Sequence, residues 1–367
     1  MNTPVLAVCT AILVIATLVP LSRNPVWWVR ALDFPRGQLV VLSVVLLGLS
    51  LWRLDLEETV VLLMLAAQIG CLAYHLVWIS PYTFLAPREV RNATREGTHP
   101  HLRILSFNVL TPNRRVEDLL RIIRREDPDV VITVETDRWW QEQLSPLRET
   151  HPHGINCPLD NLYGMHLFSR YPLEDAALQF LVEEGVPSIH ALVVLPNQRR
   201  IRLHCLHPAP PSPTENESSS ERDAELVMVG RSVADSPHPV IVTGDLNDVA
   251  WSRTTRLFRK LSGLLDPRVG RGMFNTYHAK IPLFRWPLDH IFHSKDFTLL
   301  ELHRLEACGS DHFPVLIDLA LEDPKAEAQR DEGLDAEAED VEEAEEKTRA
   351  EGVSPSAVHQ PGESRRA

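Results

Sequence analysis

The sequence is poor in cysteine, and its few cysteines are not spaced as metal ligands are. Five occur in 367 residues, and Cys9 and Cys71 lie in apolar runs. The remaining Cys157, Cys205 and Cys308 are an odd number without close spacing. This pattern argues against a zinc site and does not identify the redox compartment. The chain also has no internal repeat, which argues against a repeat architecture.

Charged residues are nearly absent from three stretches close to the N-terminus, at about Val5–Pro20, Leu39–Trp52 and Thr59–Ile79. The third is long enough to cross a bilayer, and the first two are shorter. The first lacks the positive flank and the small-residue cleavage site of a signal peptide. Tryptophans mark the ends of the runs, as interface anchors do: Trp27, Trp28, Trp52 and Trp78. We therefore predict three transmembrane helices within residues 1–87, in a multi-pass protein of the cell (inner) membrane.

The orientation of these helices has two readings. The first loop carries Arg23, Arg30 and Arg36, whereas the second carries only Arg53. Three further arginines follow the third helix: Arg88, Arg91 and Arg95. Since positive loops stay in the cytoplasm, this count places the rest of the chain there. A family resemblance described below favours the opposite side.

The sequence also has no excess of basic residues. The net charge is −13, and residues 322–367 hold 15 acidic and 6 basic side chains, or −9 of that total. Such a tail, with few aromatics, is expected to be solvated and disordered. The body at residues 101–321 is then only mildly acidic, so its charge does not identify a ligand. We expect three parts: a membrane region at 1–87, the body at 101–321 and the tail at 322–367.

Within the body, strand-like and helix-like patterns alternate, which predicts an α/β domain. Helical spacing of apolar residues occurs over Arg114–Glu126, where Asp127–Pro128 ends it, and helices are also expected at Arg222–Val233 and Ser252–Leu261. Strands are expected at Arg103–Asn108, Asp129–Val134, Met165–Ser169, Ile189–Leu195, Ile201–Leu206, Val240–Val242, Leu288–His293 and Phe313–Leu319.

Polar side chains follow many of these strands at the point where each ends. Asp245 and Asn247 come two apart after Val240–Val242, so alternation directs both toward one cleft. Others follow or precede the remaining strands: Asn108, Glu135, His207, Asp289, His290, Asp311 and His312. Each alone fits a turn, a helix cap or a surface histidine. Together, carboxylate and amide oxygens suit a hard cation such as Mg²⁺, and histidines suit proton transfer.

The ordered motifs SFNVL, VVITVETD, LHPAPP, GDLND, PLDHIF and GSDHFPV resemble the endonuclease/exonuclease/phosphatase superfamily over about Leu102–Leu319. The resemblance implies a four-layered α/β sandwich, in which helices flank two mixed sheets, preceded here by the three membrane helices. It also implies hydrolysis of phosphate esters with Mg²⁺, for which Mn²⁺ is a possible substitute.

Roles carried over from the resemblance fall on individual residues. Asn108 and Glu135 would bind the metal, with Asp311 near it. Asp245 would orient or activate the attacking water, and Asn247 would hold a phosphate oxygen. His312 would act as acid/base, oriented by Asp289, and His207 would stabilise the transition state. Whether Asp245 or His312 handles the proton of the water stays open.

Departures from the DNA-repair members bear on the substrate. The loop Pro208–Glu221 is polar and acidic, and Ile281–Trp286 (IPLFRW) is an apolar loop suited either to packing or to contact with lipid. Three helices before this domain also look like a bacterial membrane subgroup. That subgroup includes a glycopeptide-resistance phosphatase, thought to act on polyprenyl pyrophosphate outside the cytoplasm. Three hypotheses result: a membrane-anchored phosphoesterase acting on a lipid-linked or other small phosphate ester, a nuclease of the same fold that binds nucleic acid, or a non-catalytic membrane-tethered binding protein.

Overall fold

The computed structural model describes residues 3–93, 99–322 and 333–363. Arg95 and the two ends of the tail, 323–332 and 364–367, lie outside this range. The chain divides into two compact units. The helical unit consists of Met1–Pro87 with the short segments Pro211–Ser219 and Gly270–Gly272, and the sandwich unit contains the rest of the chain.

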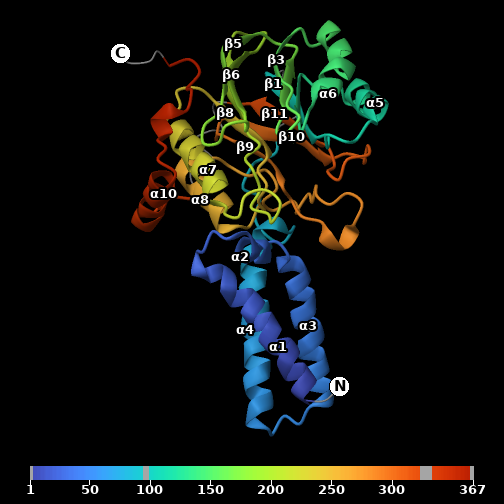
Figure 1. Ribbon diagram of the computed structural model, residues 1–367, viewed down its shortest axis with the longest axis vertical. Coiled ribbons are helices and arrows are strands. Elements are labelled where there is room, and N and C mark those ends of the chain that lie inside the picture. The colour runs from blue at the N-terminus through green and yellow to red at the C-terminus, as the bar shows by residue number, and fades with distance from the viewer. Residues whose placement is uncertain (1–2, 94–98, 323–332, 364–367) are drawn as a thin grey trace. The chain divides into compact units, whose positions relative to one another are not determined.

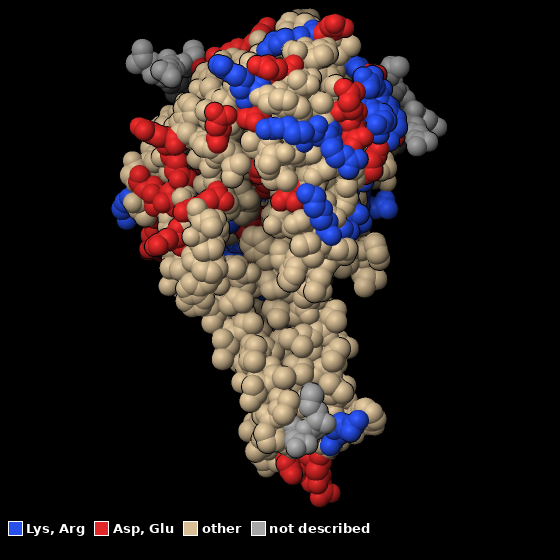
Figure 2. All heavy atoms as spheres, turned by 45° about the vertical axis from the view of Figure 1, so that its right-hand side comes forward, with Lys and Arg blue, Asp and Glu red and all other residues tan. Residues whose placement is uncertain are grey.

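Three helices of the helical unit are long and apolar enough to cross a membrane. They are α1 (Thr3–Leu18), α3 (Arg36–Arg53) and α4 (Thr59–Ile79), and a short helix α2 (Trp27–Arg30) lies between the first two. Their outer surface is an almost continuous uncharged area in Figure 2. In the chain, charged residues return in the connection between α3 and α4. The structure thus has the three apolar helices that the sequence predicts.

Polar side chains join these helices inside the unit. The amide of Gln68 in α4 donates to Thr10 in α1 at 2.7 Å and to Ser50 in α3 at 3.1 Å. Further along α4, the imidazole of His75 lies 3.0 Å from the hydroxyl of Thr17 in α1. All of these side chains are buried. Contacts of this kind link helices where no water competes for them.

The sandwich unit contains two mixed sheets. The first has the strand order β10-β11-β1-β2-β4-β3, in which only the pair β1 and β2 is parallel. The second has the order β5-β6-β7-β8-β9, with β7 and β8 parallel. The first sheet is built from β1 (His101–Asn108), β2 (Val130–Val134), β3 (His153–Cys157), β4 (Met165–Ser169), β10 (Phe297–Arg304) and β11 (Val315–Leu321). The second is built from β5 (Leu173–Gln179), β6 (Ser188–Val194), β7 (Arg200–Cys205), β8 (Val240–Asp245) and β9 (Asp289–His293).

The pattern of buried side chains defines four layers. Alternate residues of both sheets, such as Ile104 of β1 and Leu203 of β7, form the core between them. The other face of the first sheet packs against α5 (Val116–Glu126) and α6 (Arg138–Gln143). The other face of the second sheet packs against α7 (Ser220–Val233) and α8 (Arg253–Ser262). Figure 1 shows these helix pairs on opposite sides of the sheets. The predicted four-layered α/β sandwich is confirmed.

Local chemistry accounts for the helix ends. In α5, Leu119, Ile122 and Ile123 lie on one buried face, and Asp127 ends the helix with φ = 49° just before Pro128. Since a residue before proline disfavours helical geometry, the helix stops there. In α8, the hydroxyl of Ser252 accepts the N–H of Thr255 as an N-cap, and Gly263 provides the left-handed C-terminal residue.

The tail differs from the expectation of disorder over 338–350. These residues form helix α10 (Ala338–Ala350), which lies beside α7 and α8 (Figure 1). Glu337 and Asp340 complete a capping box at its start. The reason is charge pairing: acidic residues of α10 meet basic residues of α8, which a count of the tail's composition alone ignores. Asp340 lies 2.7 Å from Lys260, and Glu343 pairs with Arg253.

Candidate active site

Sheet topology brings the predicted polar residues to one edge of the sandwich. Asn108 ends β1, and Glu135 directly follows the parallel neighbour β2. In the other sheet, His207 follows β7 and Asp245 ends its parallel neighbour β8. The antiparallel strand β9 begins with Asp289 opposite Asp245. The carboxyl ends of parallel strands share an edge, so residues distant in sequence meet there.

Asn108 links the two sheets at this edge. Its amide nitrogen donates to Glu135 Oε1 at 2.7 Å and to Asp245 Oδ2 at 3.0 Å. Its Oδ1 accepts the backbone N–H of Leu110 at 3.0 Å. In this arrangement Asn108 holds two carboxylates together through its N–H groups, while its oxygen is engaged by the backbone. Its role as a metal ligand stays a prediction that needs the amide to turn.

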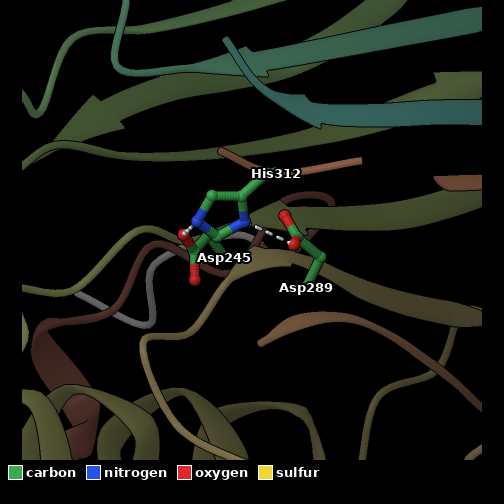
Figure 3. A group of neighbouring side chains, drawn as sticks. All are labelled: Asp245, Asp289 and His312. Atoms are coloured by element: carbon green, nitrogen blue, oxygen red, sulfur yellow. Dashed lines mark hydrogen bonds and ion pairs between the residues drawn. The ribbon is translucent and has the colours of Figure 1, made fainter. Parts of the chain in front are cut away.

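The imidazole of His312 lies between two carboxylates (Figure 3). Its Nδ1 is 2.7 Å from Asp289 Oδ2, and its Nε2 is 3.4 Å from Asp245 Oδ2. All three residues are buried. Asp245 and Asp289 are cross-strand partners, so their like charges would repel without the histidine between them.

This placement sets the pKa of His312. Burial alone lowers it, but the carboxylates of Asp289 and Asp245 outweigh burial and raise the pKa of His312 to about 10. Burial would raise the pKa of Asp289, yet the contact with His312 lowers it overall. The residue is therefore an imidazolium at neutral pH, held in orientation by Asp289, and it can donate a proton from Nε2.

Asp245 and Glu135 behave differently from Asp289. Burial raises the pKa of Asp245 to about 6, against the opposing effect of His312. Burial also raises the pKa of Glu135 to about 7, with Asp245 and Asp311 adding to the effect. Glu135 and Asp245 are thus two buried carboxylates joined by one amide, and burial outweighs the stabilisation that Asn108 and His312 give them. No lysine or arginine pairs with Glu135 or Asp311 among the residues that the structure describes.

A divalent cation would supply the missing positive charge, and the donor set fits one. Glu135, Asp245 and Asp311 offer oxygen ligands of the kind that Mg²⁺ and Mn²⁺ prefer. In the described part of the chain, one group of three His, Cys, Asp or Glu side chains brings ligand atoms within 4.8 Å of one another, namely Asp245, Asp289 and His312. That group is a poor metal site, because an imidazolium with protons on both nitrogens has no lone pair to give.

His207 faces the same cluster in a neutral form. Its Nε2 lies 4.0 Å from Asp245 Oδ2, and the ring of Tyr163 lies beside it. Burial, followed by the repulsion from His312, lowers the pKa of His207 to about 3. A neutral imidazole can donate a hydrogen bond to a charged oxygen without adding another positive charge next to His312.

Two residues of the cluster have left-handed backbones. Glu135 has φ = 58° and Asn247 has φ = 51°, values that non-glycine residues seldom adopt. At Asn247 the backbone N–H donates to Asp245 Oδ1, and the side-chain amide donates to the carbonyl of Pro208 at 3.0 Å. One N–H of that amide stays available for a phosphate oxygen. These local bonds place the Asn247 side chain at the site.

Several supporting residues carried no signal in the sequence. The hydroxyl of Ser310 donates to the carbonyl of Asn108 at 2.7 Å and accepts the N–H of His312, and so fixes the histidine to β1. Thr276 accepts the N–H of Asp289. The ring of Tyr277 lies 4.9 Å from that of His312. His290, which the sequence grouped with Asp289, instead bonds Arg268 and the carbonyl of Asp248, away from His312. Ser and Thr are common in every loop, so only the fold distinguishes these.

The four layers and the carboxylate–imidazole cluster define a phosphoesterase of the sandwich type. The sequence profile of the Endonuclease/Exonuclease/phosphatase family matches residues 105–312, and the chain belongs to that family. It is accordingly a metal-dependent hydrolase of phosphoric esters. No curated protein sequence matches the chain.

Solved structures resemble the chain at the level of fold. An endonuclease/exonuclease/phosphatase from Beutenbergia cavernae is 17% identical, covering 61% of this chain and 72% of its own, with a TM-score of 0.49. The human Nocturnin catalytic domain with bound sulfate is 16% identical (66% and 99% covered, TM-score 0.49). D. rerio TDP2, complexed with single-strand DNA product, is 19% identical (60% and 98% covered, TM-score 0.49).

Proposed function

We propose that this protein is a membrane-anchored, Mg²⁺-dependent phosphoesterase that hydrolyses a lipid-linked phosphate ester. The observation that carries the lipid assignment is an exposed apolar segment beside the candidate site. Ile281, Leu283 and Phe284 are 44%, 66% and 50% exposed. Soluble surfaces seldom leave consecutive large apolar side chains in water without a use for them. We call Ile281–Phe284 the apolar lip.

An aromatic path connects the apolar lip to the site. Phe284 packs on Trp286 with ring centroids 5.9 Å apart, and Trp286 stacks on Tyr277 at 6.3 Å. Tyr277 in turn contacts the imidazole of His312 at 4.9 Å. An ester with its phosphate at His312 would therefore have apolar surface next to its organic group. This arrangement suits a prenyl or acyl chain better than a sugar.

Two arginines next to the path favour an anionic substrate. The guanidinium groups of Arg285 and Arg304 lie over the ring of Phe313, at 5.0 and 4.4 Å from its centroid. Burial, with Arg285 nearby, lowers the pKa of Arg304. In the described parts of the chain neither arginine has an ion pair with a carboxylate. Such cations can attract phosphate groups, whether of a lipid or of a nucleic acid.

The chain's own side chains divide the work of hydrolysis as follows. Asp245, whose pKa burial raises to about 6, orients the attacking water and accepts its proton. His312 donates a hydrogen bond or proton to a phosphate oxygen, and Asp289 keeps the imidazole in place. Asn247 and His207 donate to the oxygens that gain charge as the phosphorus becomes five-coordinate. Preformed donors of this kind stabilise the transition state without rearrangement.

Glu135 would hold the cation, with Asp311 and Asp245 beside it and Asn108 fixing their positions. When bound, Mg²⁺ would neutralise charge on the phosphate. Burial raises the pKa values of Glu135 and Asp245, which supports this assignment because a cation would stabilise their charged forms. The three apolar helices support attachment to the cell membrane, where a lipid substrate is found.

The test is product release by the full-length protein in detergent, with Mg²⁺ and with EDTA. The panel contains a polyprenyl pyrophosphate, a phosphodiester phospholipid and plasmid DNA. Metal-dependent turnover of a lipid is expected. Cleavage of DNA alone would replace the proposal by a tethered nuclease. Failure on all three substrates, with the fold intact, would favour a binding protein or a soluble ester.

A further inference from the structure

Helix α10 is held to the sandwich unit mainly by ion pairs. Lys260 of α8 lies 2.7 Å from Asp340, Arg253 of α8 pairs with Glu343, and Lys347 lies 2.7 Å from Asp223 of α7. Its apolar contact is small, with Ala344 packed against Val227 and Leu257. The helix also lies beyond residues 105–312, the part that the family profile matches.

One of these ion pairs leads into the candidate site. Asp223 accepts Lys347 at its Oδ2, and its Oδ1 accepts both Nε and Nη2 of Arg222, at 3.1 and 2.9 Å. The remaining arm of Arg222, Nη1, donates to the backbone carbonyl of Asn247 at 2.8 Å. Arg222 and Asp223 are 1% and 2% exposed. We call Lys347, Asp223, Arg222 and the Asn247 carbonyl the relay.

The relay acts on a backbone that needs support. Asn247 has φ = 51°, and a left-handed conformation at asparagine costs energy that its surroundings must offset. Its N–H is held by Asp245 and its carbonyl by Arg222, so both sides of the residue are fixed by charged groups. Asp248, the next residue, also lies 3.5 Å from Arg222. Movement of Arg222 would therefore shift the segment that carries Asn247.

We infer that Lys347 is a positioning residue for the phosphoesterase, acting on Asn247 through Asp223 and Arg222. The inference rests on the proposed role of Asn247 in binding a phosphate oxygen. Lys347 occupies Oδ2 of Asp223, which leaves only Oδ1 for Arg222 and directs Nη1 toward the carbonyl. Without Lys347, the carboxylate of Asp223 can turn both oxygens toward the guanidinium of Arg222. Nη1 of Arg222 is then no longer directed at the carbonyl of Asn247.

Charge balance leads to the same conclusion. Two cations, Lys347 and Arg222, face the buried carboxylates of Asp223 and Asp248, and Lys347 also lies 3.9 Å from Glu343. Burial would raise the pKa of Asp223, but Lys347 and Arg222 lower it well below its usual range. Removal of Lys347 leaves Arg222 to balance the buried carboxylates of both Asp223 and Asp248. As a result, the hydrogen bond from Arg222 to the carbonyl of Asn247 is weakened.

The test compares Lys347→Met with Lys260→Met in the full-length protein. The two lysines are matched: each has a side chain 22% exposed, and each holds α10 to the unit by a 2.7 Å ion pair. Only Lys347 belongs to the relay. Turnover of p-nitrophenyl phosphate and bis(p-nitrophenyl) phosphate is measured with Mg²⁺. Lys347→Met is expected to lower kcat/KM about 10- to 100-fold, as misplacement of a contacting group does. Lys260→Met should stay within about twofold, and Lys347→Arg should recover part of the loss.

Hydrogen exchange gives a readout that does not need turnover. Lys347→Met should speed exchange in peptides covering Leu246–Val249, whereas Lys260→Met should speed exchange in α10 alone. Equal losses of activity in both variants would show that α10 only stabilises the fold and would overturn the inference. Unchanged exchange at Leu246–Val249 in Lys347→Met would overturn it as well. If the wild-type protein cleaves no ester, the proposed function fails while the exchange result still decides on the relay.

Discussion

Asn108 and Asp245 meet across the two sheets, with the Asn108 amide donating to Asp245 Oδ2 at 3.0 Å. Asn108 ends β1 of the first sheet, and Asp245 ends β8 of the second. The same amide reaches Glu135 at 2.7 Å. A single neutral side chain therefore fixes the separation of two carboxylates that would otherwise repel each other. The spacing of the candidate metal site depends on this contact.

Asn108→Ala should disable the enzyme and weaken the fold. Glu135 and Asp245 would each lose a hydrogen bond while buried, which costs about 2 kcal/mol of unfolding free energy. Activity should fall at least about 100-fold because both carboxylates move. Urea unfolding and phosphate-ester turnover measure the two effects. The control Asn161→Ala removes a loop amide bonded to Gly185 and should leave activity unchanged. Wild-type turnover in Asn108→Ala would contradict this account of the site.

Asp289→Asn should shift the pH profile as well as lower the rate. Asp289 is the strongest of the groups that raise the pKa of His312 to about 10, so its loss lowers that pKa. If protonated His312 is the acid, the alkaline limb of kcat moves to lower pH in the variant. The rate should drop by about 10²- to 10⁴-fold at its optimum. An alkaline limb at the wild-type position would remove His312 from the role of acid.

The contact between His312 and Asp289 makes the free energy of unfolding depend on pH. The pKa of His312 is raised from 6.5 to about 10, so the folded state holds this proton more tightly than the unfolded state. Its contribution is complete below about pH 6.5 and is lost as the pH rises through about 10. Urea unfolding in EDTA at pH 7, 8.5 and 10 should show this decline. The decline should be smaller in Asp289→Asn, and equal slopes would contradict the assignment.

Metal binding should weaken as the pH falls through neutrality. Burial raises the pKa of Glu135 to about 7, so protons compete with a cation for its carboxylate below that value. Mn²⁺ affinity, measured by titration calorimetry, should fall about tenfold per pH unit between pH 7 and 5.5. Without metal, the raised pKa stabilises the fold below about pH 4.5, and this contribution is lost as the pH rises through about 7. Mg²⁺ should therefore raise Tm more at pH 8 than at pH 6.

Glu135→Gln tests the same prediction from the opposite direction. It removes the titrating group while it keeps the shape of the side chain. Metal affinity should be lower at every pH and should lose most of its pH dependence. A variant that binds Mn²⁺ like the wild type would move the site away from Glu135.

The apolar lip can be tested without touching the catalytic groups. The double substitution Leu283→Ser and Phe284→Ser should lower turnover of a long-chain lipid phosphate about tenfold, since each buried methylene contributes about 0.8 kcal/mol. Turnover of p-nitrophenyl phosphate should not change. Phe180 is 48% exposed elsewhere on the sandwich unit, and Phe180→Ser serves as the matched control. Equal losses on both substrates would show that the lip supports the fold instead.

Much of the fold follows from the sequence because its strands are apolar on both faces. The segment Val130–Val134 is wholly buried, and its run of β-branched residues identifies it as a central strand. By contrast, the edge strands β3, β5 and β10 were not predicted. β5 (LEDAALQ) lies at a sheet edge with exposed acidic residues, and β10 loses its burial halfway along. Edge strands have no continuous apolar pattern, so their pairing depends on neighbours that the sequence does not place.

Only part of the candidate site could be predicted from the sequence. Motifs at strand ends pointed to Glu135, Asp245 and His312, which the fold brings together. They could not reveal that Asn108 donates to two carboxylates, because an amide serves equally as donor or acceptor. Nothing in the sequence distinguishes Arg222 from other arginines of a helix. Lys347 lies in the tail, which was predicted to be disordered from its composition alone. Lys347 pairs with Asp223, 124 residues earlier in the chain, and Arg222 donates to the carbonyl of Asn247, 25 residues later.

The polar contacts within the helical unit restrict which sequences can replace its three apolar helices. Gln68 must face Thr10 and Ser50 at once, and His75 must face Thr17 one level away. Contacts at two positions along α4 allow only one orientation of this helix about its axis, whereas leucine side chains alone would allow several. Apolar helices of equal length without these groups would have the same outer surface, but their rotation relative to one another would not be fixed. The alignment of the three helices therefore depends on five polar side chains: Thr10, Thr17, Ser50, Gln68 and His75.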